Sequence, residues 1–295
     1  MVGLLRGTVR VDSYHSAWAE VAREHCERIR CALGDDCLDV QHVGSTSVPG
    51  LAAKPIIDIA VAIADFTPLL ISRLESVGYI YRPSDEIGQW LFVQGQGEMR
   101  SAHIHLVKYM SMEWRNYLNF RDYLRTFPNH REEYQQLKLS LAEKYPLDRE
   151  TYTKSKAEFI QYTLRKAMVW SYIGKQISAE IDRPVGYLHC KGNKQLLYPI
   201  NYGFIPGVLG GDGEELDVYC LGCEKPVKTF EGKVIAIVHR ADDVEDKLVA
   251  CDPAQAFSLA DICNQIYFQE KYYDSTVELY DGERMHVSAE EKHVR

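Results

Sequence analysis

Long apolar runs and an excess of basic charge are both missing from this 295-residue chain. No stretch approaches the roughly 18 apolar residues of a membrane-spanning helix, and the first residues lack the apolar core of a signal peptide. Lys and Arg number 34 against 42 Asp and Glu, for a formal net charge of −8. That balance argues against a nucleic-acid binder that works by neutralising phosphates. We therefore expect a cytoplasmic protein with neither a membrane nor nucleic acid as partner.

The sequence also lacks a complete cysteine-based metal motif. Eight cysteines are scattered along the chain, and Cys220 and Cys223 form a single CxxC. A structural zinc site needs four ligands, and no second CxxC or CxxH is present. Reduced thiols are the favoured interpretation, and a metal or redox role for the CxxC is the less favoured one.

Hydrophobic periodicity divides the chain into two segments of different character. Its hydrophobic content of 46% and charged content of 26% are typical of soluble globular proteins. In the first segment we predict strands at 7–11, 37–43, 55–63, 79–83, 90–94 and 102–107, with helices at 15–33, 66–77 and, in three pieces, 114–168. In the second we predict strands at 196–204, 217–221, 232–240 and 247–250, and a helix at 258–273 with Ser258 as its N-cap.

These patterns predict two domains joined by a short linker. Residues 1–168 should form an α+β domain, a mixed sheet covered by helices. Residues 169–174 would be the linker, and residues 175–295 a small β-barrel-like domain with a terminal helix.

The most informative stretch is YPINYGFIPGVLGGDGEELD at residues 198–217. An aromatic-rich strand leads into a glycine-rich turn, and Asp212, Glu214 and Asp217 then fall within six positions. Such crowding raises carboxylate pKa values unless a cation is present, and hard divalent cations such as Mg²⁺ favour oxygen ligands. The alternative interpretation is a solvated acidic hairpin loop.

This stretch, with GKVIA at 232–236 and DDVEDKL at 242–248, resembles the soluble family I inorganic pyrophosphatases over about residues 175–280. The resemblance implies Mg²⁺-dependent hydrolysis of pyrophosphate or a related phosphoanhydride, with Asp217 holding the metals that activate water. The implied metal ligands are Asp212, Glu214, Asp217, Asp242 and Glu245, with Asp246 as an alternative to Glu245. The implied catalytic and substrate-binding side chains are Asp217, Lys247, Tyr202, Tyr198, Tyr272 and Arg183.

One departure from the pyrophosphatase pattern lies near the end of the chain. Tyr273 follows Tyr272 where the family has a phosphate-binding lysine. On this basis we expect Tyr273→Lys to raise the affinity for phosphate.

A second constellation occupies residues 42–60, HVGSTSVPGLAAKPIIDIA. Gly44, Ser45 and Thr46 form a turn whose backbone N–H groups and hydroxyls suit phosphate oxygens. Asp58 lies in an otherwise apolar strand, where a carboxylate is costly unless it is paired or bound to metal. His103 and His105, two apart, share one face of another strand. The plainer alternative is that these histidines only hydrogen-bond Asp58.

Together with FRDYLR at 120–125 and YTKSK at 152–156, this constellation resembles the GrpB (UPF0157) family over residues 8–168. That family is related to nucleotidyltransferases, so the resemblance implies a nucleotidyltransferase-like fold. The implied substrate-binding residues are Gly44, Ser45, Thr46, Lys54, His103 and His105, and the implied metal ligand is Asp58. Ala60 stands where that fold has its second carboxylate, which two-metal transfer requires.

Three interpretations of the first domain stay open: an active nucleotidyltransferase, a degenerate nucleotide-binding module, which we favour, and a structural domain. The two resemblances together predict a fusion in which pyrophosphate hydrolysis would make nucleotidyl transfer irreversible. A non-catalytic nucleotide- or phosphate-binding regulatory module is the alternative. The sequence leaves the oligomeric state open, with a homo-oligomer among the options.

Overall fold

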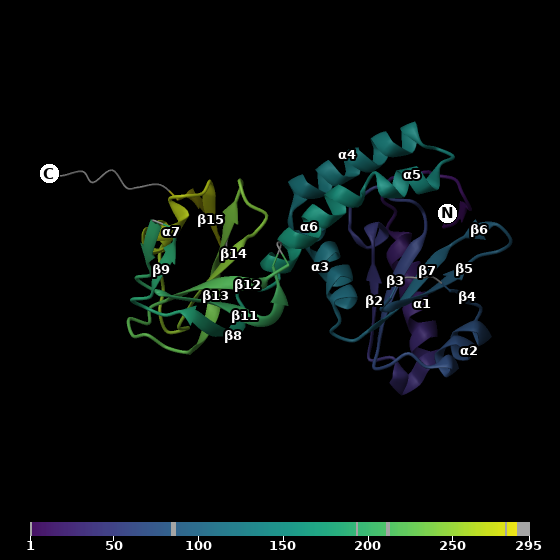
Figure 1. Ribbon diagram of the computed structural model, residues 1–295. Coiled ribbons are helices and arrows are strands. Elements are labelled where there is room, and N and C mark those ends of the chain that lie inside the picture. Colours follow the sequence, from purple (N-terminus) through teal and green to yellow (C-terminus); the bar gives the residue numbers. More distant parts are fainter. Residues whose placement is uncertain (1, 84–86, 193, 211–212, 281, 288–295) are drawn as a thin grey trace. The chain divides into compact units, whose positions relative to one another are not determined.

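The computed structural model describes residues 2–83, 87–192, 194–210, 213–280 and 282–287. The chain divides into two compact units, Met1–Ala167 and Met168–Arg295 (Figure 1). We call them the N-terminal and C-terminal units. Within the described ranges, no helix is both long enough and apolar enough to span a lipid bilayer.

The N-terminal unit is built on a five-stranded mixed sheet, as predicted. Its strands, in spatial order, are β2 (Asp39–Val43), β3 (Ile57–Ile63), β7 (Ala102–Lys108), β5 (Gln89–Gln94) and β4 (Ile80–Arg82). The central pair, β3 and β7, is parallel, and the other neighbours are antiparallel. The two strands that carry Asp58, His103 and His105 are therefore adjacent.

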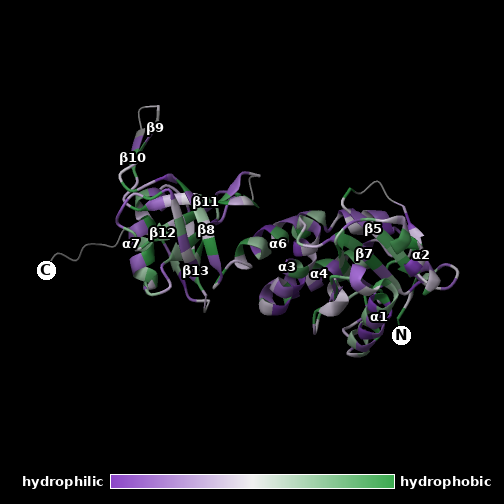
Figure 2. Ribbon diagram, turned by 90° about the horizontal axis from the view of Figure 1, so that it is seen from below, coloured by the Kyte–Doolittle hydropathy of each residue, from purple (hydrophilic) through white to green (hydrophobic). Residues whose placement is uncertain are grey.

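Helices cover both faces of this sheet. On one face, the alternate residues Ile57, Ile59, Val61 and Ile63 pack against α1 (Ala17–Leu33) and α2 (Pro68–Ser76). Figure 2 shows hydrophilic as well as hydrophobic residues on α1, as expected for a helix with one face on a core. On the other face, Ala60 and its neighbours pack against Trp114 of α3 (Met112–Thr126). Asp58 shares this second face, because side chains alternate along a strand.

Two predictions for the N-terminal unit were wrong in detail. Residues 7–11 do not form a strand: Gly7 has a φ of 86°, and the N–H of Val9 bonds Pro146 instead of a neighbouring strand. A short strand, β1 (Leu4–Leu5), pairs with β6 (Met99–Arg100).

Residues 112–170 hold four helices where three were predicted: α3, α4 (Pro128–Lys144), α5 (Arg149–Lys154) and α6 (Ala157–Trp170). Helix α5 forms because Asp148 caps it by accepting the N–H of Thr151 at 3.0 Å.

The C-terminal unit is a closed five-stranded barrel with a helix, in agreement with the prediction. The ring runs β14 (Lys247–Cys251), β12 (Glu215–Leu221), β11 (Asn201–Leu209), β8 (Gln176–Arg183) and β13 (Thr229–Arg240), and pairing of β13 with β14 closes it. β15 (Ser275–Leu279) and β16 (Arg284–His286) extend the sheet from β13, and β9 (Leu188–Lys191) pairs with β10 (Lys194–Leu197) as a separate hairpin.

The terminal helix of this unit is α7 (Leu259–Glu270). Ser258 is its N-cap, as predicted, and forms a reciprocal capping box with Asp261. The helix packs Ile262 and Ile266 against the barrel core. This packing buries its last residue, Glu270, against Arg240 of β13.

Candidate functional site

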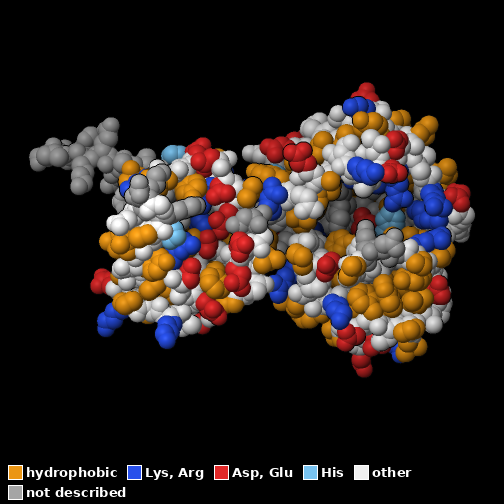
Figure 3. All heavy atoms as spheres, in the orientation of Figure 1, with side chains coloured by type: hydrophobic (Ala, Val, Ile, Leu, Met, Phe, Trp, Pro, Cys, Tyr) orange, Lys and Arg blue, Asp and Glu red, His pale blue; other side chains and the backbone are white. Residues whose placement is uncertain are grey.

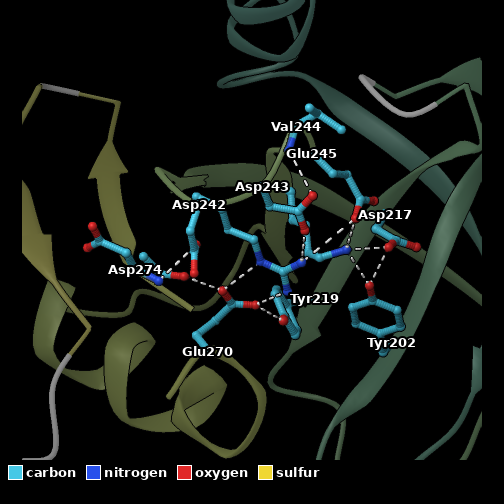
Figure 4. Close-up of polar contacts among 12 residues, drawn as sticks. Tyr202, Asp217, Tyr219, Asp242, Asp243, Val244, Glu245, Glu270 and Asp274 are labelled. Carbon is cyan, nitrogen blue, oxygen red and sulfur yellow. Dashed lines mark hydrogen bonds and ion pairs between the residues drawn. The ribbon is translucent and has the colours of Figure 1, made fainter. Parts of the chain in front are cut away.

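The centre of the barrel site is the ammonium group of Lys247, the first residue of β14. Its side chain is 2% exposed. The ammonium donates to Tyr202 Oη at 2.8 Å, to Glu245 Oε2 at 2.6 Å and to the carboxylate of Asp217 (Figure 4). β11, β12 and β14 are neighbours in the barrel, which brings Tyr202, Asp217 and Lys247 together. Four of the predicted site residues thus form one cluster.

The two carboxylates of this cluster differ in pKa. Burial raises the pKa of Asp217, but the charge of Lys247 and hydrogen bonds, including that from Tyr202, bring it below its ordinary value. Burial and contact with Asp217 raise the pKa of Glu245 to about 7, against the opposing effect of Lys247. Burial also raises the pKa of Tyr202 well above 10, so this phenol is a neutral donor. Asp217 is therefore the carboxylate that balances Lys247, whereas Glu245 gains or loses its proton near neutral pH.

Arg183 lies on the β8 side of this cluster. It donates from Nη1 to Tyr198 Oη at 2.6 Å, and its guanidinium carbon lies 5.0 Å from the ring centroid of Tyr202. Asp182 precedes it on β8; burial and the neighbouring Asp217 raise the Asp182 pKa, and Arg183 opposes them. Sequence reasoning missed Asp182, although it directly precedes a predicted site residue.

Sequence reasoning also missed a buried ion-pair network, which contacts the Lys247 cluster through Arg240 and Glu245. Glu270, whose side chain is 0% exposed, accepts from Arg240 Nε at 3.0 Å, from Arg240 Nη2 at 2.6 Å, from Ser275 Oγ at 2.5 Å and from the hydroxyl of Tyr219. Arg240 in turn lies 3.1 Å from Asp243 and 3.8 Å from Glu245. The sequence did carry a signal for this network, because Arg240 ends the largely apolar strand β13 and Glu270 ends the helix α7.

Other predicted residues of the C-terminal unit lie apart from Lys247. Asp242 accepts the backbone N–H of Asp274 at 2.9 Å, and Figure 4 shows it directed toward Asp274 and away from Asp217. Asp246 bonds His239 at 2.8 Å, so Glu245 and not Asp246 contacts Lys247.

The remaining predictions for this unit fall on its surface or on undescribed residues. Glu214 lies exposed in the turn before β12, and the ring of Tyr272 is exposed after α7. Asp212 lies outside the described residues. The neighbouring Tyr273 places its ring centroid 3.6 Å from the guanidinium carbon of Arg240.

The barrel cluster fits a hard divalent cation by the chemistry of its donors. Asp217 and Glu245 provide carboxylate oxygens, the ligands that Mg²⁺ prefers, and a bound cation would favour the ionised form of Glu245. A cation there would draw on these two side chains, and Asp182 of β8 is a further carboxyl group close enough for the charge of Asp217 to raise its pKa.

In the N-terminal unit, the turn after β2 packs directly on Asp58. Gly44 has a φ of 68°, and a Cβ placed on it would lie 2.6 Å from Asp58 Oδ2. Only glycine suits this backbone and this contact. Thr46 is buried, and its hydroxyl lies 3.0 Å from His42 Nε2.

The other carboxylate oxygen of Asp58 meets two histidines. Asp58 Oδ1 lies 3.1 Å from His103 Nδ1 and 3.6 Å from His105 Nε2. Burial raises the pKa of Asp58, but the two histidines outweigh it and hold that pKa below its ordinary range. Within the described residues, these side chains are the one group of three or more His, Cys, Asp or Glu residues whose ligand atoms all lie within 4.8 Å of one another.

A cavity of about 240 Å³ opens beside this group, and it is strongly basic. Gly44, Ser45, Thr46, Asp58 and His103 line it together with Lys54, Lys138, Arg149 and Lys156. Burial, with help from the nearby Lys54, lowers the pKa of Lys156 to about 8. In Figure 3, Lys and Arg side chains gather beside a hollow of this unit. Several cations confined with one carboxylate call for an anionic ligand.

Sequence reasoning identified Lys54 as a site residue but not Lys138 of α4, Arg149 of α5 or Lys156 of the turn between α5 and α6. A second, apolar cavity of about 500 Å³ adjoins the basic one, since Gly44 and Phe120 line both.

Comparison with known proteins identifies both units. The GrpB protein family model matches residues 8–166, and the inorganic pyrophosphatase family model matches residues 171–278. UPF0157 protein YqkA of Bacillus subtilis is 32% identical over 55% of this chain and 48% of its own length. An inorganic pyrophosphatase of Neisseria meningitidis is 41% identical over 25% of this chain and 48% of its own length. The chain thus spans about half the length of each of these two relatives.

Among solved structures, the GrpB protein of Enterococcus faecalis is 34% identical and matches with a TM-score of 0.51, covering 54% of this chain and 96% of that one. The N-terminal unit therefore has a GrpB fold. The chain belongs to the GrpB family, and an inorganic pyrophosphatase domain follows its GrpB domain.

Proposed function

We propose that the C-terminal unit hydrolyses pyrophosphate, or a related phosphoanhydride, with Mg²⁺ as its cofactor. The observation that carries the proposal is the cluster of Lys247, Asp217, Glu245 and Tyr202, inside a barrel that the pyrophosphatase family model matches. A bound Mg²⁺ would neutralise phosphoryl oxygens and lower the pKa of a bound water.

The protein's own residues have separable roles in this proposal. Asp217 and Glu245 hold the cation. The ammonium of Lys247, released from the carboxylates when the cation arrives, contacts a phosphoryl oxygen as a compact charge. The neutral phenol of Tyr202 and the guanidinium of Arg183 donate to further phosphate oxygens.

For the GrpB unit, we propose the binding of a nucleotide. The basic cavity suits the phosphates, and the adjoining apolar cavity suits the base, because the two share Gly44 and Phe120. The face that carries Asp58 has Ala60 in the position of a second carboxylate, so we propose binding and not two-metal nucleotidyl transfer. In the alternative, regulatory case, nucleotide binding would occur without any turnover in either unit.

The hydrolysis proposal is tested by phosphate release from pyrophosphate and from a panel of nucleoside triphosphates, with Mg²⁺ and with EDTA. We expect metal-dependent release, greatest from pyrophosphate. Binding of pyrophosphate without release would favour the regulatory module, and release from triphosphates alone would move the substrate to nucleotides.

Nucleotide binding is tested by calorimetry with ATP on Lys156→Ala and, as a matched control, Lys154→Ala. Lys156 lines the basic cavity, whereas the side chain of Lys154 is 76% exposed and pairs with Glu150. We expect weaker binding for the first variant alone. Equal affinity in both would place the nucleotide elsewhere.

A further inference from the structure

We propose that Asp58, His103 and His105 form a binding site for one divalent transition-metal ion in the GrpB unit. This inference goes beyond the proposed function: it concerns a different unit and a different class of metal from the Mg²⁺ of the barrel. It requires neither nucleotide binding nor pyrophosphate hydrolysis.

The fold places the three side chains on one face of two adjacent parallel strands. Asp58 of β3 pairs with His103 of β7, and Ala60 pairs with His105. Since residues two apart project to the same side, His103 and His105 flank the carboxylate. His105 therefore lies beside Ala60, the position at which a nucleotidyltransferase-like fold would carry its second carboxylate.

The orientation of each ligand atom is fixed by a neighbour. Gly44 packs against Asp58 Oδ2, which leaves Oδ1 toward the histidines at 3.1 and 3.6 Å. The ring of His105 packs on Tyr117 with centroids 4.9 Å apart. These contacts hold a preformed arrangement, and small movements would bring all three ligand atoms onto one ion.

Within the part of the chain that the structure describes, His105 has only a long polar contact, the one between its Nε2 atom and Asp58 Oδ1. Its Nδ1 atom is buried and has no hydrogen-bond partner among the described residues, and its Nε2 atom is 3.6 Å from Asp58, beyond hydrogen-bond range. Its side chain is only 16% exposed. Coordination of Nε2 by a metal would replace this long contact with a direct bond to an ion that Asp58 Oδ1 also reaches.

The donor set selects the class of metal. Imidazole nitrogens suit Zn²⁺, Fe²⁺, Co²⁺ and similar ions, whereas Mg²⁺ and Ca²⁺ prefer sites made of oxygen. Two histidines and one carboxylate also leave coordination positions open, as in zinc and iron sites that bind substrate. Here Asp58 and His103 line the basic cavity, so an anionic group bound there can complete the coordination.

The test is Co²⁺ binding to the full-length chain in excess Mg²⁺, with cysteines alkylated to remove thiolate ligands. We expect one equivalent of Co²⁺ with a visible absorption spectrum of low-symmetry coordination. His103→Asn and His105→Asn should each weaken binding by more than the roughly 10–100-fold that second-layer substitutions cost. His15→Asn, a substitution at an exposed histidine of the same unit, should bind as the unaltered chain does.

X-ray absorption of the Zn²⁺-loaded, unaltered protein needs no variant and so does not depend on the variants folding. We expect scattering from two imidazoles and no sulfur. Three results would overturn the proposal. The unaltered chain could fail to bind Co²⁺, both histidine variants could bind it as tightly as the unaltered chain, or the zinc could show no imidazole among its ligands. The Asp58 group would then be a hydrogen-bonded cluster and nothing more.

Discussion

Replacing Glu270 by Gln should destabilise the barrel unit by about 3 kcal/mol. The carboxylate is fully buried and forms two hydrogen bonds with Arg240, whose side chain is 2% exposed. Breaking a buried ion pair from one side costs about 3–5 kcal/mol, because the remaining charge loses its counter-ion. The lower end applies here, because Arg240 keeps Asp243 at 3.1 Å and Glu245 at 3.8 Å.

Urea unfolding of the full-length chain measures this effect. The GrpB unit serves as an internal reference, because the substitution lies outside it. Glu231→Gln, at an exposed position of β13, is the matched control and should change stability by less than about 0.5 kcal/mol. A loss below about 1 kcal/mol in Glu270→Gln would refute the view that Arg240 depends on this carboxylate.

Three further predictions follow from single positions. The contact of the Tyr273 ring with Arg240 reverses the expectation from sequence that Tyr273→Lys raises phosphate affinity: the substitution places a like charge beside Arg240, so it should lower barrel stability by about 0.5–2 kcal/mol without tightening phosphate binding. Urea unfolding and pyrophosphate titration check this, and tighter binding at unchanged stability would contradict it. Gly44→Ala should cost the GrpB unit at least about 1 kcal/mol in urea and displace Asp58, and unchanged stability would contradict the close contact. Burial lowers the pKa of His25 to about 4, so on acidification the unfolded state takes up this proton before the folded state does. The free energy of unfolding should therefore fall as the pH drops from about 6.5 to 4, and His25→Gln should reduce this pH dependence in urea unfolding. An unchanged pH dependence would assign it to other groups.

Hydrophobic periodicity predicted the central elements of both units because their burial repeats along the chain. The run Ile57–Ile63 is apolar on both faces and was predicted as a strand for that reason. β8 was missed, although Ile177, Ala179 and Ile181 carry the alternation of a half-buried strand. The strand predicted at 196–204 is interrupted at Pro199, which has no N–H to offer a ladder.

The candidate sites were predictable where their residues lie in short motifs. Tyr202, Asp217 and Lys247 lie in the motifs that resemble the pyrophosphatases, and that resemblance already assigned them to one site; the pairing of β12 with β11 and β14 brings them together. The partners Arg240 and Glu270 are 30 residues apart and meet only because α7 docks on the barrel.

The basic cavity shows the same limit. Lys138 and Lys156 reach it from separate parts of the helical region, and although Lys156 ends the YTKSK motif, nothing in the sequence shows that either lysine lines a cavity. Which charges are buried together is a property of tertiary packing.

The most direct test of the central claim is the rate of phosphate release from pyrophosphate by Asp217→Asn, beside Glu231→Gln and the unaltered chain, in Mg²⁺. Asn is nearly isosteric with Asp but carries no charge, so the barrel should stay folded by circular dichroism while its hold on the cation is lost. The account predicts turnover in the unaltered chain and in Glu231→Gln, and none above background in Asp217→Asn. Equal turnover in all three would contradict the assignment of the Lys247 cluster as the hydrolytic site.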